Sequence, residues 1–166
     1  NTSGYWNSSS SGNWANGSLW TITSGTGSVP GGGSGVATFS PNNANPGNPT
    51  ALTANVTVNL KSNKGAANDF TVRAVVFDAN TPSYNFTIAS GAGALKFASS
   101  ASITVAAGQS HNINSEIALD AGNDGLNKLG EGTISFGGTA ANTLTNQITV
   151  SEGTILLNKT AGVDAI

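Results

Sequence analysis

The chain has no cysteine and no methionine among its 166 residues. Without cysteine it contains no disulfide, no thiolate nucleophile and no Cys-ligated zinc or iron–sulfur site. Because there is no methionine, Asn1 is not an initiator residue, which fits either removal of an export signal or excision from a longer chain. We therefore expect an exported protein, extracellular or at the cell surface.

Charged residues are also scarce. Six basic and eight acidic residues make up 8% of the chain, with a net charge of −2, against about 25% in an ordinary globular protein. Nucleic-acid binders carry a basic stripe and membrane-surface proteins a polybasic patch, and neither occurs here. No apolar run approaches the roughly 20 residues of a membrane helix. We expect no nucleic-acid partner and no membrane insertion of this segment.

The same scarcity bears on catalysis. Arg73 is the single arginine, so the clustered charged groups that a polysaccharide lyase or hydrolase needs on one strand face are missing. His111, the single histidine, lies between Ser110 and Asn112, and we interpret it as a solvated turn residue rather than part of a Ser-His-Asp triad. The chain is expected to be non-enzymatic and, calcium aside, without a cofactor.

What the chain does contain is a repeat. Glu131-Gly132-Thr133-Ile134 recurs as Glu152-Gly153-Thr154-Ile155, 21 residues later, and residues 103–108 resemble residues 148–153, 45 residues later. A period near 20 residues is typical of a solenoid, in which each repeat is one coil. Stacked coils would place Ile134 above Ile155, Phe136 above Leu157 and Glu131 above Glu152.

The rest of the pattern is all-β. Period-two alternation predicts strands, with no 3.6-residue helical spacing in any long run. The expected strands are 56–60, 70–77, 84–89, 94–97, 102–106, 112–119, 132–136, 146–150 and 154–157. The repeat favours a right-handed parallel β-helix over the alternative, an antiparallel β-sandwich, which needs no repeated sequence and favours tight hairpin turns.

The first 50 residues differ from the remainder. Trp6, Trp14 and Trp20, the only tryptophans, lie among Asn, Ser and Gly. We divide the chain into an extended aromatic cap at residues 1–50 and β-helix coils at residues 51–166. The tryptophans are expected to cover the open end of the solenoid, since terminal repeats need an atypical cover. The alternative is a platform that stacks on sugar rings.

Two segments carry a family resemblance. Residues 126–138 read Leu-Asn-Lys-Leu-Gly-Glu-Gly-Thr-Ile-Ser-Phe-Gly-Gly, and residues 150–159 read Val-Ser-Glu-Gly-Thr-Ile-Leu-Leu-Asn-Lys. Together, at 126–159, they resemble the autotransporter-associated β-strand repeat. The resemblance implies a bacterial secreted or surface-displayed passenger with a right-handed parallel β-helix, as part of a longer protein. This family has no shared catalytic residues, so the resemblance implies none here.

One segment resembles a calcium loop. In residues 120–131, Asp120, Asp124 and Glu131 occupy ligand positions of the D-x-[DN]-x-[DN]-G-x5-E pattern. Gly122 occupies the third position and supplies no ligand, and no helices flank the segment. The alternative is a plain turn between coils.

These observations predict a non-enzymatic extracellular structural or adhesive surface module. Self-association through the β-helix ends, head to tail into fibres, is the expected partnership, because an uncovered coil presents unpaired strand edges. The alternative function is a carbohydrate-binding module for a surface polysaccharide.

Overall fold

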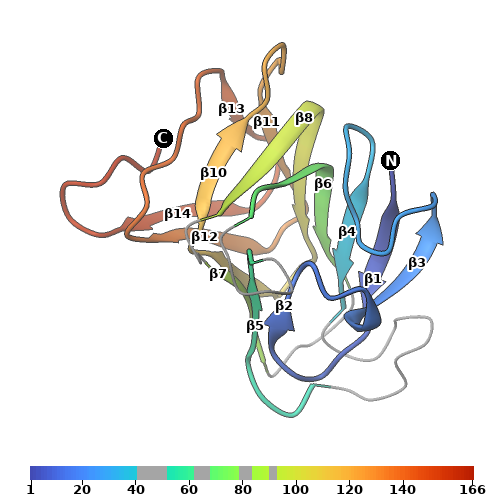
Figure 1. Cartoon of the computed structure of the whole chain (residues 1–166). Helices are drawn as coiled ribbons and strands as arrows, with labels where there is room; N and C mark the ends of the chain where they lie inside the picture. The colour runs from blue at the N-terminus through green and yellow to red at the C-terminus, as the bar shows by residue number, and fades with distance from the viewer. Residues whose placement is uncertain (41–51, 62–67, 79–83, 90–92) are drawn as a thin grey trace.

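The computed structural model describes residues 1–40, 52–61, 68–78, 84–89 and 93–166 (Figure 1). Strands make up 52% of the chain, and 2% is helical, namely the 3-10 turn η1 (Gly17–Leu19). None of the described helices is long and apolar enough to cross a membrane. The strands are β1 (Ser3–Trp6), β2 (Gly12–Asn13), β3 (Trp20–Ser24), β4 (Val36–Phe39), β5 (Val56–Asn59), β6 (Phe70–Phe77), β7 (Phe86–Ala89), β8 (Ala94–Val105), β9 (Ser110–Ile113), β10 (Glu116–Leu119), β11 (Leu126–Leu129), β12 (Thr133–Gly138), β13 (Ile148–Val150) and β14 (Thr154–Lys159).

These strands form two sheets in which neighbours come from successive coils. One runs β13-β11-β8-β6-β4-β1-β3, with β10 also on β8, and the other runs β14-β12-β9-β7-β5-β2. Every pair between these strands is parallel except β1–β3. The result is a parallel β-solenoid of about 3 turns, visible as side-by-side arrows in Figure 1. The parallel β-helix is confirmed over the antiparallel sandwich.

A bend in β8 gives the solenoid a third face beside β10. The first part of β8 pairs with β10, Ala94 opposite Glu116, and the second part pairs with β11, Ala101 opposite Leu126. Ser100, at φ 61°, lies at the bend and is the one non-glycine residue with positive φ in the described part of the chain. Residues 94–97 and 102–106 were expected as two strands, but 94–97 and 102–105 belong to one bent strand, which ends at Val105.

The 21-residue echo sets the register of the last coils. Ile134 pairs with Ile155 and Phe136 with Leu157, as the repeat predicts. The second echo is displaced by two residues, because Ile103 pairs with Lys128 and Lys128 with Val150. Ile103 thus stands in the column of Val150, whereas the echo aligns it with Ile148.

The expected strand boundaries hold less well where polar residues interrupt the alternation. Residues 112–119 were expected to form one strand, but they belong to β9 and β10, which are separated by Asn114 and Ser115. β11 lies where the sequence pattern predicts no strand. The expected boundary between the cap at 1–50 and the coils at 51–166 falls at residues 50 and 51, which lie outside the described residues. Within the segment 1–50, β4 already pairs in parallel with β6.

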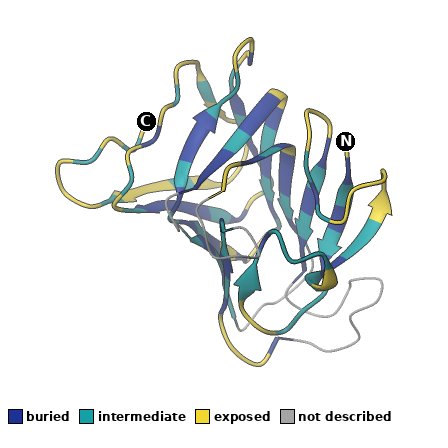
Figure 2. Ribbon diagram, viewed as in Figure 1, coloured by how far each residue is buried: buried dark blue, intermediate teal, exposed yellow. Residues whose placement is uncertain are grey.

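The core is a set of columns that run along the solenoid. At the N-terminal end they are aromatic, with Phe39 stacked on Phe77 at 5.4 Å between ring centroids. Toward the C-terminal end they are mostly aliphatic, and Ile113, Ile117 and Ile134 are fully buried. Burial ends abruptly at the last coil, where β14 is drawn largely as exposed in Figure 2.

Candidate functional site

The C-terminal end of the solenoid is an open apolar surface. A hollow of about 220 Å³ is lined there by Ile148, Val150, Ile155, Leu157 and Ile166. Val150 is 49% exposed, Leu157 53% and Ile166 64%. Because these apolar side chains remain exposed to water, they gain little of the hydrophobic stabilisation that burial gives the other residues of the columns. We call these five residues the open end.

The strand register pairs residues of the last coil with buried residues of the preceding coil. Val150 pairs with Lys128, Ile155 with Ile134 and Leu157 with Phe136. Each of those upper residues is at most 1% exposed. The side chains of the open end thus occupy core positions that lack only the next coil.

The backbone at this end is unpaired as well. Within the described residues, β14 pairs only with β12 and β13 only with β11. On the third face, the Asn142 backbone N–H donates to Asp164 O at 3.0 Å, and Asn142 Nδ2 donates to Ala165 O at 2.7 Å. These bonds hold the segment that carries Ile166 beneath the third face. Such an edge is a template for strand pairing.

A buried lysine fixes the corner directly above the open end. Lys128 Nζ donates to three backbone carbonyls, Leu129 O at 2.8 Å, Gly130 O at 2.6 Å and Glu152 O at 3.2 Å. Burial lowers the pKa of Lys128, while the Glu152 carboxylate opposes the shift. Glu152 Oε2 in turn accepts the Gly130 N–H at 2.9 Å. Lys128 and Glu152 therefore tie one coil corner to the next.

His111 lies in the core, so its interpretation as a solvated turn residue is wrong. It is fully buried, stacked on Phe77 at 4.5 Å and 13°. Its Nδ1 accepts the Phe86 N–H at 3.0 Å, and its Nε2 lies 2.8 Å from Gln109 Oε1. Burial lowers its pKa to about 4. The ring therefore fills an inward column position in its neutral form.

The structure does not bring the expected calcium ligands Asp120, Asp124 and Glu131 together into one group. The Asp124 carboxylate accepts the Ser100 N–H at 3.2 Å, and Asp120 accepts the Asn123 N–H through its backbone. Glu131 lies beyond β11, whose four residues span roughly 13 Å. Among the described residues, no three His, Asp or Glu side chains form a group that could hold a metal ion.

The tryptophans lie inside the N-terminal end. Trp6 and Trp14 are fully buried and Trp20 nearly so. Trp14 lies 5.0 Å from Trp20 between ring centroids and stacks on Phe70 at 5.5 Å. Since no ring face is open to solvent, the geometry corrects the alternative of a glycan-stacking platform and fits a cap.

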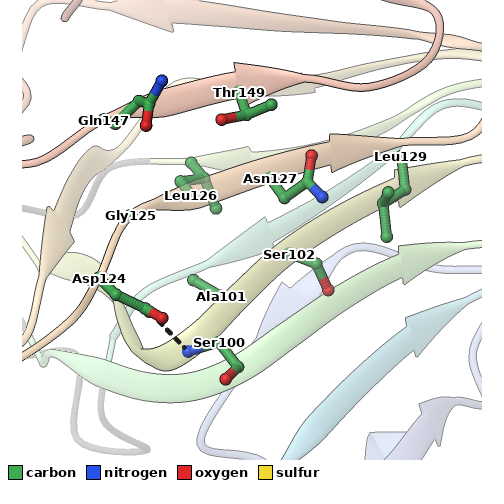
Figure 3. A pocket seen from close by; sticks show the side chains of 10 residues that line it. All are labelled: Ser100, Ala101, Ser102, Asp124, Gly125, Leu126, Asn127, Leu129, Gln147 and Thr149. Carbon is green, nitrogen blue, oxygen red and sulfur yellow. Dashed lines mark hydrogen bonds between the residues drawn. The ribbon is translucent and has the colours of Figure 1, made fainter.

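A groove on the outer face was not anticipated from the sequence. It has a volume of about 390 Å³, with Ser102, Asn127 and Thr149 in one row across β8, β11 and β13 (Figure 3). Its only charged residue is Asp124, at one end. The lining residues are Ser100, Ala101, Ser102, Asp124, Gly125, Leu126, Asn127, Leu129, Gln147 and Thr149. Outward polar side chains in a repeat could have indicated this row, once the register of β11 was known.

Comparison with known proteins finds no matching family model, no matching curated protein and no matching solved structure.

Proposed function

We propose that this chain is a non-enzymatic structural or adhesive module of an extracellular or cell-surface protein. The stacked coils carry the proposal, because their inward positions are filled by apolar side chains and the corner at Lys128 is occupied by a group that satisfies buried backbone. Head-to-tail fibres, expected from the sequence, would need an open N-terminal end too. The buried tryptophans oppose that form of assembly.

The charged and polar groups inside the coils support a structural role. Lys128 serves three carbonyls, and Lys159 Nζ donates to Ser115 O at 2.9 Å. His111 accepts a backbone N–H. Each of these groups satisfies buried backbone, which is a requirement of folding rather than of chemistry on a substrate.

The residues that resemble the autotransporter-associated repeat support surface display, because they also occupy structural positions at the coil corners. Lys128 clamps the corner, Gly130 has φ 73° and Gly153 φ 70°. A Cβ at Gly153 would lie 2.4 Å from Gly130 O and Gly132 O of the coil above. The motif thus specifies the corners of a coil, and its function would be to build long stalks.

Protease treatment of intact source cells tests this proposal. Surface display predicts that peptides of this chain are released before lysis, and that beads coated with the chain adhere to one another or to cell surfaces. Beads coated with Ile134→Asp, which breaks a fully buried column, are the control. Peptides released only after lysis would contradict surface display.

A second candidate function is carbohydrate binding, favoured by the groove. Hydroxyl and amide side chains together with the apolar Leu126 and Leu129 line the groove, a combination that suits neutral sugars. Calorimetry with neutral oligosaccharides tests it, with Asn127→Leu expected to abolish binding. Thr87→Leu, on the outer face of the other sheet, is the control. Equal heats for both variants would contradict a site in the groove.

A further inference from the structure

The groove on the outer face repeats one polar position in successive coils. Ser102 pairs with Asn127 and Asn127 pairs with Thr149, and all three line the groove. We call these three residues the polar row. In the two coils above, the same strand position is occupied by Ala74 and Val36. The row is therefore polar along the groove and apolar beyond its N-terminal end.

The polar row has hydrogen-bonding capacity that the fold does not use. The hydroxyls of Ser102 and Thr149 have no hydrogen-bond partner among the described residues. Asn127 Oδ1 accepts the Ser151 hydroxyl at 2.7 Å, which orients the amide and leaves Nδ2 free to donate. In Figure 3 this nitrogen lies on the side of Ser102. All three side chains can therefore bond to a ligand in the groove.

A second set of unused polar groups lies at the corner beside the row. Ser100 and Gln147 stand directly before Ala101 and Ile148, which occupy paired positions on either side of Leu126. Neither the Ser100 hydroxyl nor the Gln147 amide has a partner within the described part of the chain. A ligand that follows the groove from coil to coil thus meets polar groups along two lines.

The charge of the groove restricts what it can bind. Asp124 is the single charged residue of its lining, and one carboxylate oxygen already accepts the Ser100 N–H. Lys128 lies on the same strand as Asn127, but its ammonium group donates to three backbone carbonyls. An acidic ligand would meet a carboxylate without a compensating cation. The groove therefore suits a neutral ligand that is rich in hydroxyl groups.

We propose that the groove binds a neutral, extended polysaccharide that lies along the solenoid axis, with one sugar residue on each coil of the polar row. The inference rests on the second candidate function, carbohydrate binding, and names its ligand class and orientation. Neighbouring strands lie about 4.7–4.9 Å apart, and one pyranose unit advances an extended chain by nearly the same distance. Successive sugars therefore meet Ser102, Asn127 and Thr149 in equivalent positions.

Calorimetry with neutral oligosaccharides of one, two and three units, from the glucose, mannose and xylose series, tests the proposal. For the sugar that binds, each added unit should tighten binding by about threefold to tenfold, since it adds roughly one net hydrogen bond. A trimer of galacturonic acid, which carries a carboxylate on each unit, should not bind. Tighter binding of the acidic trimer would overturn a site for neutral chains.

Two variants distinguish the end of the polar row from its middle. Thr149→Val keeps the side-chain shape and should lower the affinity for the trimer to about that for the dimer. The dimer should change by no more than about twofold, because it can still lie on Ser102 and Asn127. Asn127→Leu interrupts both adjacent pairs and should abolish binding of dimer and trimer. Thr57→Val, on the outer face of the other sheet, is the matched control and should change neither.

The possible failures are distinguishable. If a neutral oligosaccharide binds but the two variants weaken dimer and trimer equally, or have no effect, carbohydrate binding stands and the placement along the axis is overturned. If no neutral oligosaccharide binds the unchanged chain, the second candidate function is overturned together with this inference. Circular dichroism checks that each variant is folded. None of these results touches surface display, which the protease experiment measures separately.

Discussion

The backbone N–H of Phe86 donates a 3.0 Å hydrogen bond to Nδ1 of His111, inside the solenoid. Because Nδ1 accepts, the proton of the neutral ring lies on Nε2, 2.8 Å from the side-chain oxygen of Gln109. A second proton on Nδ1 would turn the acceptor into a donor against the Phe86 N–H. The fold therefore requires a neutral histidine in an aromatic environment.

Acid should weaken the protein through this residue. The folded-state pKa of His111 is about 4, below its ordinary value of 6.5. The unfolded chain thus binds the proton first, and stability is complete above pH 6.5 and lost as the pH falls toward 4. The expected loss is about 3 kcal/mol. Urea unfolding at a series of pH values between 4 and 7 measures it.

A His111→Gln variant isolates the contribution of the imidazole. It keeps Asp78, whose pKa is raised by burial and whose effect on stability has the opposite sign, growing as the pH falls. The variant should be less stable at neutral pH and should lack the decrease between pH 6.5 and 4. An unchanged pH dependence in the variant would contradict the role given to His111.

The Lys128 clamp predicts a large cost for a change that keeps the side-chain volume. Lys128→Met leaves three carbonyls at the coil corner without their donor, and we expect a loss of about 3 kcal/mol in the free energy of unfolding. Chemical denaturation measures it. Lys96→Met, which removes only an exposed ion pair with Asp69, should change little. Equal effects of the two changes would exclude the clamp.

Two glycines with nearly the same positive φ allow the cost of backbone strain to be separated from the cost of close packing. Gly130 has φ 73° and Gly108 φ 75°. A Cβ at Gly130 would lie 2.3 Å from Val105 O, whereas at Gly108 it would meet nothing within 4 Å. Gly108→Ala should therefore cost about 1 kcal/mol from φ alone, and Gly130→Ala about 1–3 kcal/mol more. Similar losses in denaturation midpoint would show that the coils are not in close contact there.

The cap should be a cooperative part of the fold. Trp14→Ala removes a fully buried ring whose Nε1 donates to Pro30 O at 3.1 Å, with an expected cost of about 4 kcal/mol. Tryptophan fluorescence of the unchanged chain should resist quenching by acrylamide, because all three rings are enclosed. Ready quenching, or a negligible effect of Trp14→Ala on unfolding, would contradict a buried cap.

Much of the fold could be predicted from residue periodicity. Alternation identified most strands, and the Glu-Gly-Thr-Ile echo identified the solenoid and the pairing of Ile134 with Ile155. This succeeded because stacked coils impose the same inward and outward positions on each repeat. The upstream coils lack a matching echo, so their register came only from the structure. The displaced alignment of Ile103 shows how a weak echo slips by two residues on the same face.

The polar interior could not be predicted in this way. His111 has Ser110 and Asn112 as neighbours, and its column shows only once β9 is aligned with β12, where it pairs with Ile134. From the sequence alone, Lys128 would be expected at the surface, and only the structure shows that its ammonium group donates to buried backbone carbonyls. The segment 120–131 matches the calcium-loop pattern in sequence, but strand β11 lies between Asp124 and Glu131 and keeps these two residues apart. Composition and spacing do not show which polar side chains form hydrogen bonds with the buried backbone groups at a coil corner.

The stacking of Thr133 on Thr154 can be measured directly by engineering a disulfide between the two coils. The chain has no cysteine, so a Thr133→Cys/Thr154→Cys pair, directly opposite on β12 and β14, should form an intramolecular disulfide on mild oxidation. Thr133→Cys/Leu156→Cys, two residues out of register on the same face, should not, because its Cα atoms are about 8 Å apart. Peptide mapping by mass spectrometry identifies the linkage. A disulfide in the second pair, or none in the first, would contradict the 21-residue coil.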